Sequence, residues 1–113
     1  MRVWDVDPAL LCRAHLLGEH RELHAVFSVI ANGREGYSRH PEVRRWRGRL
    51  PALARRHDAL VAEMRRRGWT GHKTDLPPCG GEAEQSELLD SVEDQIAILR
   101  AKPCGCTLDA GAK

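Results

Sequence analysis

Glu22 and the chain's own α-amine are the two groups whose types and spacing could carry out nucleophilic chemistry. Glu22 lies 21 residues after Met1, within a segment of helical pattern. An α-amine has an ordinary pKa near 8, against about 10.4 for a lysine, so about a tenth of it is uncharged at neutral pH. An uncharged amine can attack an aldehyde or a sugar C1′ carbon to form a Schiff base. The carboxylate of Glu22 could meet such an amine.

Position 2 and the lysines decide which amine is available. We expect the bulky Arg2 to block removal of the initiator methionine, so that the amine belongs to Met1. The first lysine of the chain is Lys73. Any imine formed within the first 72 residues therefore has one candidate amine.

Three helices must position these groups, and each is indicated by apolar residues at spacings of three and four. The first is expected from about Pro8 to Ala31, with Asp7 as its N-cap. The second is expected from about Leu50 to Arg67, and the third from about Glu84 to Ala101. The sequence has neither a period-two strand pattern nor an internal repeat. We predict an all-α fold, a compact single domain of three main helices with a basic segment between the first two.

The same spacing predicts which helix faces are buried. At about 100° per residue, Glu22 lies off the apolar stripe of the first helix, on the side of Gly18. A glycine one turn before Glu22 would leave room for a backbone or a sugar. The residues expected to face the core are Leu16, Leu23, Val26, Phe27 and Ile30 in the first helix and Leu88, Leu89, Val92, Ile96 and Leu99 in the third.

Positive charge is concentrated in the middle of the chain. The formal net charge is +2, but residues 34–67 carry eleven Arg against four acids, a net +7. Guanidinium groups can hold phosphate oxygens in pairs, so this segment predicts a polyanion-binding face. Tyr37 and Trp46 among these arginines are typical of a nucleic-acid surface, but for Trp46 we favour the interpretation that it caps the core. The candidate phosphate contacts in this segment are Arg39, Arg44, Arg45 and Arg47.

Histidines and cysteines raise the question of a metal. His15 and Glu19 are four residues apart, and so are His20 and His24. The two pairs point about 140° apart on a helix, so they do not form one four-ligand site. Histidines 20 and 24 are therefore expected to be surface or packing residues, and His15 to orient Glu22 or a phosphate. We predict no metal and no cofactor, while a site in which Cys104 and Cys106 join Cys79 and a histidine stays an alternative.

Several short motifs are shared with a known family. They are Met1-Arg2-Val3, the run from Cys12 to Leu23, Val26-Phe27, Ala31-Asn32-Gly33 and the run from Met64 to Trp69, with weaker matches at Ile98 and Lys102-Pro103. Together they resemble the phage pyrimidine-dimer DNA glycosylase family, also called endonuclease V. The resemblance is strong over the first 33 residues and weak after residue 70.

This resemblance implies a function and a site. In that family the N-terminal α-amine attacks C1′ of the damaged nucleotide, a glutamate of the first helix supports the attack, and β-elimination cuts the strand. Met1 falls on the nucleophile position and Glu22 on the glutamate. Arg2 and Arg21 fall on arginines that grip phosphates near the lesion. The implied partner is double-stranded DNA containing a lesion or an abasic site.

The chain also departs from the family pattern. The phage proteins lose their methionine and attack with the residue behind it, whereas here Met1 would attack. A DNA-contacting arginine of the family falls at Ala25, and its aromatic C-terminal segment is replaced by Cys104-Gly105-Cys106. The sequence therefore does not decide which DNA lesion the protein would recognise. A non-catalytic DNA-binding module and a small metal- or redox-linked protein are the alternatives.

Length and hydropathy set the remaining expectations. A chain of 113 residues is expected to form one domain, here residues 1–103, followed by a flexible cysteine-containing tail at residues 104–113. No apolar run approaches the 18 or so residues of a membrane span, and no signal-peptide pattern occurs. We expect a cytoplasmic monomer without membrane contact.

Overall fold

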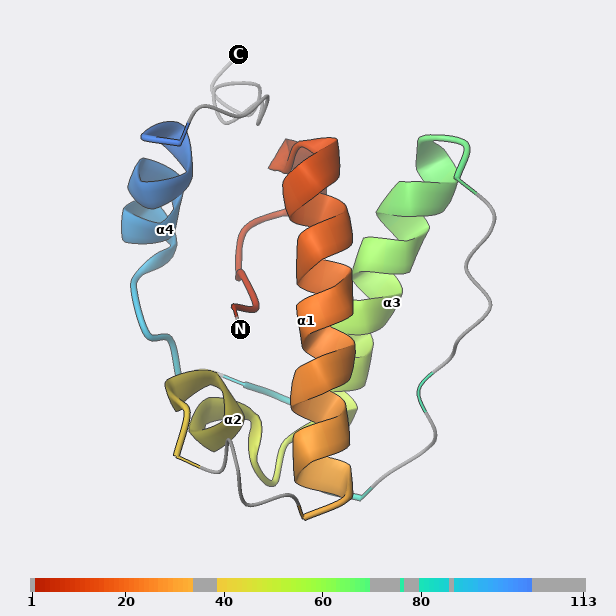
Figure 1. Ribbon diagram of the computed structural model, residues 1–113, viewed down its shortest axis with the longest axis vertical. Helices are drawn as coiled ribbons and strands as arrows, with labels where there is room; N and C mark the ends of the chain where they lie inside the picture. The colour runs from red at the N-terminus through yellow and green to blue at the C-terminus, as the bar shows by residue number, and fades with distance from the viewer. Residues whose placement is uncertain (1, 34–38, 70–75, 77–79, 86, 103–113) are drawn as a thin grey trace.

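Helices pack around a core that includes the start of the chain (Figure 1). The computed structural model describes residues 2–33, 39–69, 76, 80–85 and 87–102. Its elements are a short 3₁₀ helix η1 (Pro8–Leu10) and the α-helices α1 (Arg13–Ala31), α2 (Pro41–Trp46), α3 (Leu50–Arg66) and α4 (Val92–Arg100). No strand occurs within these ranges, so the predicted all-α class is confirmed. The expected tail at residues 104–113 lies outside them.

The first predicted helix is divided into two. Asp7 accepts a hydrogen bond from the Ala9 backbone at 3.0 Å, but it caps η1 rather than α1. Leu11 then adopts an extended conformation, with φ −81° and ψ 140°, and α1 begins only at Arg13. The Arg67 guanidinium binds the Leu11 carbonyl oxygen at 2.6 Å. A continuous helix would use that oxygen internally, so this long-range contact favours the break.

Helices α1 and α3 lie side by side, and α3 agrees with its prediction within one residue (Figure 1). The apolar stripe of α1 is buried as expected at Leu16, Leu23, Val26 and Phe27, and Ile30 packs against it partly buried. Gly68 ends α3 with φ +89°, a conformation that favours glycine. These two long helices contribute most of the buried core residues in the described ranges.

Helix α2 confirms that Pro41 opens a short helix between the two long ones. His40 caps it by accepting from the Glu42 backbone at 3.1 Å. Trp46, at its end, is 3% exposed and belongs to the core. The core-capping interpretation of Trp46 therefore holds, whereas Tyr37 lies outside the described residues.

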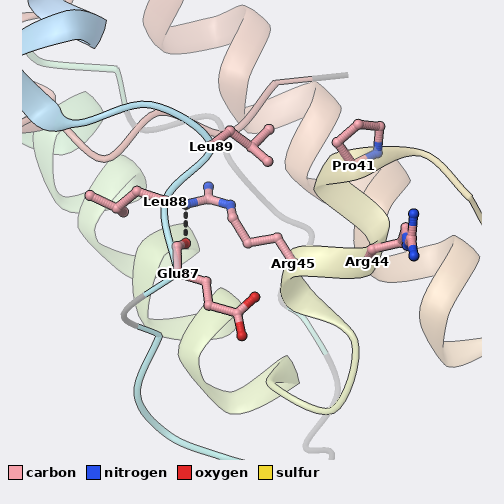
Figure 2. Close-up of a pocket in the computed structure, with 6 residues that line it drawn as sticks. All are labelled: Pro41, Arg44, Arg45, Glu87, Leu88 and Leu89. Carbon is pink, nitrogen blue, oxygen red and sulfur yellow. Dashed lines mark hydrogen bonds between the residues drawn. The ribbon is translucent and has the colours of Figure 1, made fainter.

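Helix α4 is shorter than predicted, because it begins at Val92 rather than near Glu84. Ser91 caps it, accepting from the Asp94 backbone at 3.1 Å. The described residues from 84 to 91 are not helical, and Leu88 and Leu89 are exposed rather than buried. The two leucines line a pocket together with Pro41 and Arg44 of α2 (Figure 2). Leu99 is buried and Ile96 partly so, whereas Val92 is exposed.

The reason for this late start is a set of contacts with α2. The Glu87 carbonyl oxygen accepts from Arg45 at 3.0 Å, and the Gln85 side chain donates to the Arg45 carbonyl oxygen. Sequence periodicity does not register such contacts between distant residues. None of the helices in the described ranges has the length and apolar character of a membrane span.

Candidate active site

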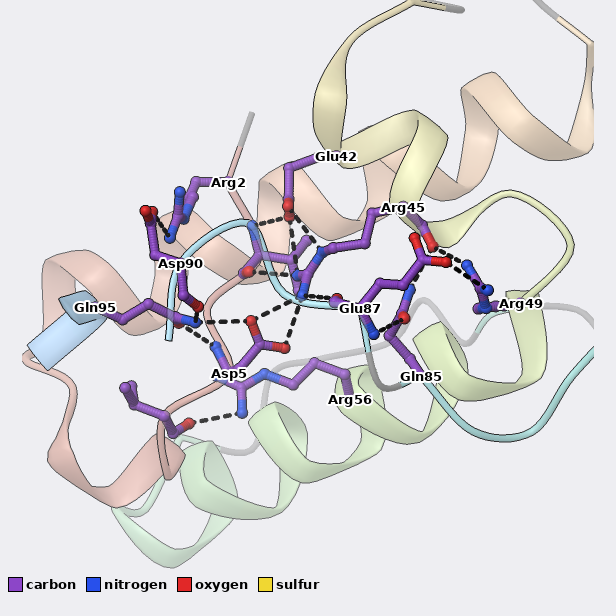
Figure 3. A network of polar contacts seen from close by, with 12 residues as sticks. Arg2, Asp5, Glu42, Arg45, Arg49, Arg56, Gln85, Glu87, Asp90 and Gln95 are labelled. Atoms are coloured by element: carbon purple, nitrogen blue, oxygen red, sulfur yellow. Dashed lines mark hydrogen bonds and ion pairs between the residues drawn. The ribbon is translucent and has the colours of Figure 1, made fainter. Parts of the chain in front are cut away.

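The first residues of the chain are held in place by side chains from α2 and α4 (Figure 3). The Val3 backbone donates to the Glu42 carboxylate at 2.7 Å, and the Val3 carbonyl oxygen accepts from Arg45 at 2.9 Å. The Asp5 backbone donates to the Gln95 side-chain oxygen, also at 2.7 Å. Val3 is fully buried. The backbone that leads to the N-terminus is therefore fixed from both sides, although Met1 itself lies outside the described residues.

The same segment contacts α1 through Glu19. This side chain is 2% exposed and accepts a backbone hydrogen bond from Trp4. Both of its oxygens are bound by Arg56, at 2.6 and 2.9 Å, and Arg56 also donates to the Val6 carbonyl oxygen at 2.7 Å. Burial raises the pKa of Glu19 above its ordinary value, although the Arg56 contact acts in the opposite direction. Glu19 is thus an internal ion-pair residue rather than a metal ligand beside His15.

Glu22 and Arg21 lie on α1 within one turn after Glu19. Arg21 is exposed and Glu22 is half-buried. A Cβ atom added at Gly18 would meet no described atom within 4 Å. The turn of α1 that precedes Glu22 therefore has open space beside it, as the sequence predicted from Gly18.

Arg2 is partly engaged by the protein itself. Its guanidinium lies 4.6 Å from the centre of the Trp4 ring and binds the Asp90 carboxylate at 3.0 Å (Figure 3). The Arg2 side chain stays 28% exposed. A phosphate could therefore reach it, in competition with Asp90.

His15 is half-buried near the start of α1. Its Nδ1 atom lies 3.2 Å from the Cys12 sulfur, and its ring meets the Trp4 ring edge-on at 6.2 Å. Seven residues span almost two full turns of helix, so His15 lies on roughly the same side of α1 as Glu22.

The basic segment divides into exposed and buried arginines. Arg39, Arg44 and Arg47 are exposed. Arg45 is 3% exposed and binds Asp5 at 2.8 Å and Glu42 at 3.0 Å. The expectation that Arg45 contacts a polyanion is therefore corrected, because its donors are used inside the protein. Figure 2 shows Arg45 pointing toward Glu87 while Arg44 points away.

Sequence reasoning missed the residues that anchor the chain's start. Glu42 and Gln95 are 1% and 0% exposed, and both act through contacts with residues 3–5. Gln95 also donates to Asp5 and to the Asp90 carbonyl oxygen. A glutamine among the apolar positions of the third predicted helix was the one available signal.

The family model described as pyrimidine dimer DNA glycosylase matches residues 1–76. The chain therefore belongs to this family, which implies DNA containing pyrimidine dimers as its substrate. The matched range includes η1, α1, α2 and α3 and ends before α4. No curated protein and no solved structure matches the chain.

Proposed function

We propose that this protein is a DNA glycosylase with AP lyase activity, using the Met1 α-amine as nucleophile and Glu22 as the assisting carboxylate. The observation that carries the proposal is the anchoring of residues 3–5, because it fixes the backbone next to the N-terminus. Trp4 in this segment donates to Glu19, which precedes Glu22 by one helical turn. The family membership supplies the reaction class.

The reaction would begin with the uncharged Met1 amine. Its nitrogen forms a bond to C1′ while the damaged base leaves with the electron pair of the glycosidic bond. Glu22, as carboxylate, stabilises the positive charge that develops at the sugar and takes up a proton from the attacking nitrogen. The C1′–O4′ bond then breaks, O4′ takes that proton, and the nitrogen and C1′ form the iminium. At an abasic site the same amine condenses with the C1′ aldehyde and water leaves.

Strand cleavage would follow from the bound iminium. The iminium makes the C2′ proton acidic, and its removal sends electrons toward C3′. The C3′–O bond then breaks and the 3′ phosphate leaves by β-elimination. No metal or cofactor is required for these steps.

The exposed arginines would hold the DNA. Arg21 lies next to Glu22, and Arg39, Arg44 and Arg47 are exposed around α2. Phosphate contacts from these residues position a duplex, and Arg2 and His15 extend the face toward the chain's start. A damaged nucleotide leaves the stack at lower cost than an intact one. We propose that the protein acts on such DNA as a monomer in the cytoplasm.

Borohydride trapping on a duplex with an abasic site tests the proposal. Untagged protein is incubated with the duplex, reduced, and digested to map the adduct by mass. We expect a covalent complex on the Met1 amine. Salt-sensitive DNA binding without an adduct would instead indicate a binding module, and an adduct on Lys73 would reject Met1 as nucleophile.

A further inference from the structure

Three histidines from two helices meet on the side of α1 that faces α3. His20 and His24 belong to α1, and His57 belongs to α3. Their ring centres are 4.6, 4.9 and 5.2 Å apart. One ring nitrogen from each lies within 4.8 Å of the other two, and the Nε2 atoms of His20 and His24 are 3.1 Å apart.

These nitrogen separations are close to those of a divalent transition-metal site. Zinc binds imidazole nitrogen at about 2.0–2.1 Å, which places two nitrogens of a tetrahedral site about 3.3 Å apart. The pair on α1 is already near this value. The longest separation must shorten by about 1.5 Å, a movement that small rotations of two imidazole rings can supply.

Burial and ligand type also favour a metal. His57 is 1% exposed, while His20 and His24 are half-buried, so an ion could enter from solvent and end inside. Three imidazole nitrogens converging on one point are a ligand set that suits zinc.

Asp58 provides the outer contact that such sites usually have. Its Oδ1 atom lies 3.1 Å from His57 Nδ1. A metal-bound histidine commonly donates its second ring N–H to a carboxylate, which fixes the ring orientation and leaves the other nitrogen for the metal. His57 would therefore bind through Nε2.

We propose that His20, His24 and His57 bind one Zn²⁺ ion that joins α1 to α3, with water at the fourth position. The sequence prediction of no metal compared His20 and His24 only with residues of their own helix and could not include His57. At about 100° per residue, Glu22 lies about 180° from His20 and His24 on α1. The ion would thus stabilise the helix that carries Glu22 without entering the proposed amine chemistry.

Metal titration of the full-length, untagged protein tests this proposal. After chelation and dialysis, we expect one Zn²⁺ per chain and a rise in Tm of at least about 5 °C at saturating Zn²⁺. His20→Gln and His24→Gln should each weaken binding by about 100-fold, and the exposed Asp58→Asn by about 10-fold. His15→Gln is the matched control, because it removes a half-buried histidine of α1 outside the cluster and should keep the affinity.

Cobalt substitution separates this site from a cysteine site. Co²⁺ held by nitrogen and water should show weak visible bands, without the intense near-ultraviolet band of thiolate ligands. The double variant Cys104→Ser, Cys106→Ser should bind as the wild type does. Absence of stoichiometric binding, or binding that survives both histidine variants while circular dichroism shows them folded, would overturn the proposal.

Discussion

At the scale of single residues, two neighbouring arginines of α2 have opposite surroundings. Arg45 is 3% exposed and neutralises Asp5 and Glu42, whereas Arg44 is exposed. The buried carboxylate of Glu42 and the partly exposed carboxylate of Asp5 are therefore both bound by one guanidinium. Sequence alone could not separate the two residues, because charge runs show composition but not the direction in which each side chain points.

Arg45→Met should destabilise the protein strongly. Removing one partner leaves buried charge uncompensated, and we expect a loss of about 3–5 kcal/mol in the free energy of unfolding, measured by urea denaturation. The matched variant Arg44→Met should change it by less than about 0.5 kcal/mol. Equal losses in the two variants would contradict the assignment of Arg45 as an internal residue.

Arg44→Met should instead weaken DNA binding. We expect the slope of log affinity against log salt to fall by about 1, because one phosphate contact is lost. Fluorescence anisotropy with a labelled duplex at several salt concentrations measures this slope. An unchanged slope would remove Arg44 from the proposed DNA face.

Glu22→Gln should abolish most strand cleavage while leaving DNA binding intact. General acid–base assistance contributes about 10²- to 10⁴-fold, so single-turnover cleavage of an abasic duplex should fall within that range. Glu93→Gln, an exposed acid in the first turn of α4, is the control and should cleave at the wild-type rate. Full cleavage by Glu22→Gln would reject the proposed role of this carboxylate.

At the scale of helices, a network of ion pairs and hydrogen bonds joins the end of α3 to the residues after η1. Glu63 binds Arg66 and Arg67, each at 2.5 Å, and Arg67 holds the Leu11 carbonyl oxygen at the break before α1. The hydrogen bond from Arg66 contributes most to lowering the pKa of Glu63 to about 2, and Arg67 adds to it. The ion pair thus persists through mildly acidic conditions.

The Glu63 ion pairs should make the free energy of unfolding depend on pH. Because the pKa of Glu63 is lower in the folded state than its ordinary 4.5, its stabilisation is complete above that value. It should decline as the pH falls from about 4.5 toward 2. We expect Glu63→Gln to unfold at lower urea concentration than the wild type at pH 7, with the difference nearly gone at pH 2. A difference independent of pH would contradict the assigned pKa.

At the scale of the whole molecule, α4 supports the first residues of the chain. The side chain of Gln95 in α4 accepts from the Asp5 backbone N–H at 2.7 Å and donates to the Asp5 carboxylate at 3.0 Å. The family match ends at residue 76, so this support comes from outside the matched range. Helix α4 therefore belongs to the proposed site through positioning rather than chemistry.

Gln95→Met tests this support while keeping the side chain's approximate volume. The Asp5 N–H would lose its partner, which should cost about 1–3 kcal/mol of stability. We expect slower borohydride trapping at an abasic duplex with unchanged duplex affinity. Gln85→Met, which removes the contact of the Gln85 side chain with the Arg45 carbonyl oxygen, should affect trapping less. Equal effects would argue against a specific role for Gln95.

The sequence predicted the parts of the fold that depend on local pattern. The range of α3 and the buried stripe of α1 follow from apolar spacing, and Pro41 marked α2. The features that were not predicted depend on contacts between distant residues. Arg67 binds the Leu11 carbonyl oxygen where the first predicted helix is interrupted, and Arg45 binds the Glu87 carbonyl oxygen in the non-helical stretch before α4. The anchors Glu42 and Gln95 escaped prediction for the same reason.

The contact between Asp5 and Gln95 also bears on how the protein is made. Ninety residues separate the two partners, so α4 must leave the ribosome before they can meet. A nascent or prematurely ended chain that stops at α3 lacks this anchor. In terms of biosynthesis, the order of the fold therefore delays assembly of the proposed strand-cutting site until α4 has been synthesised.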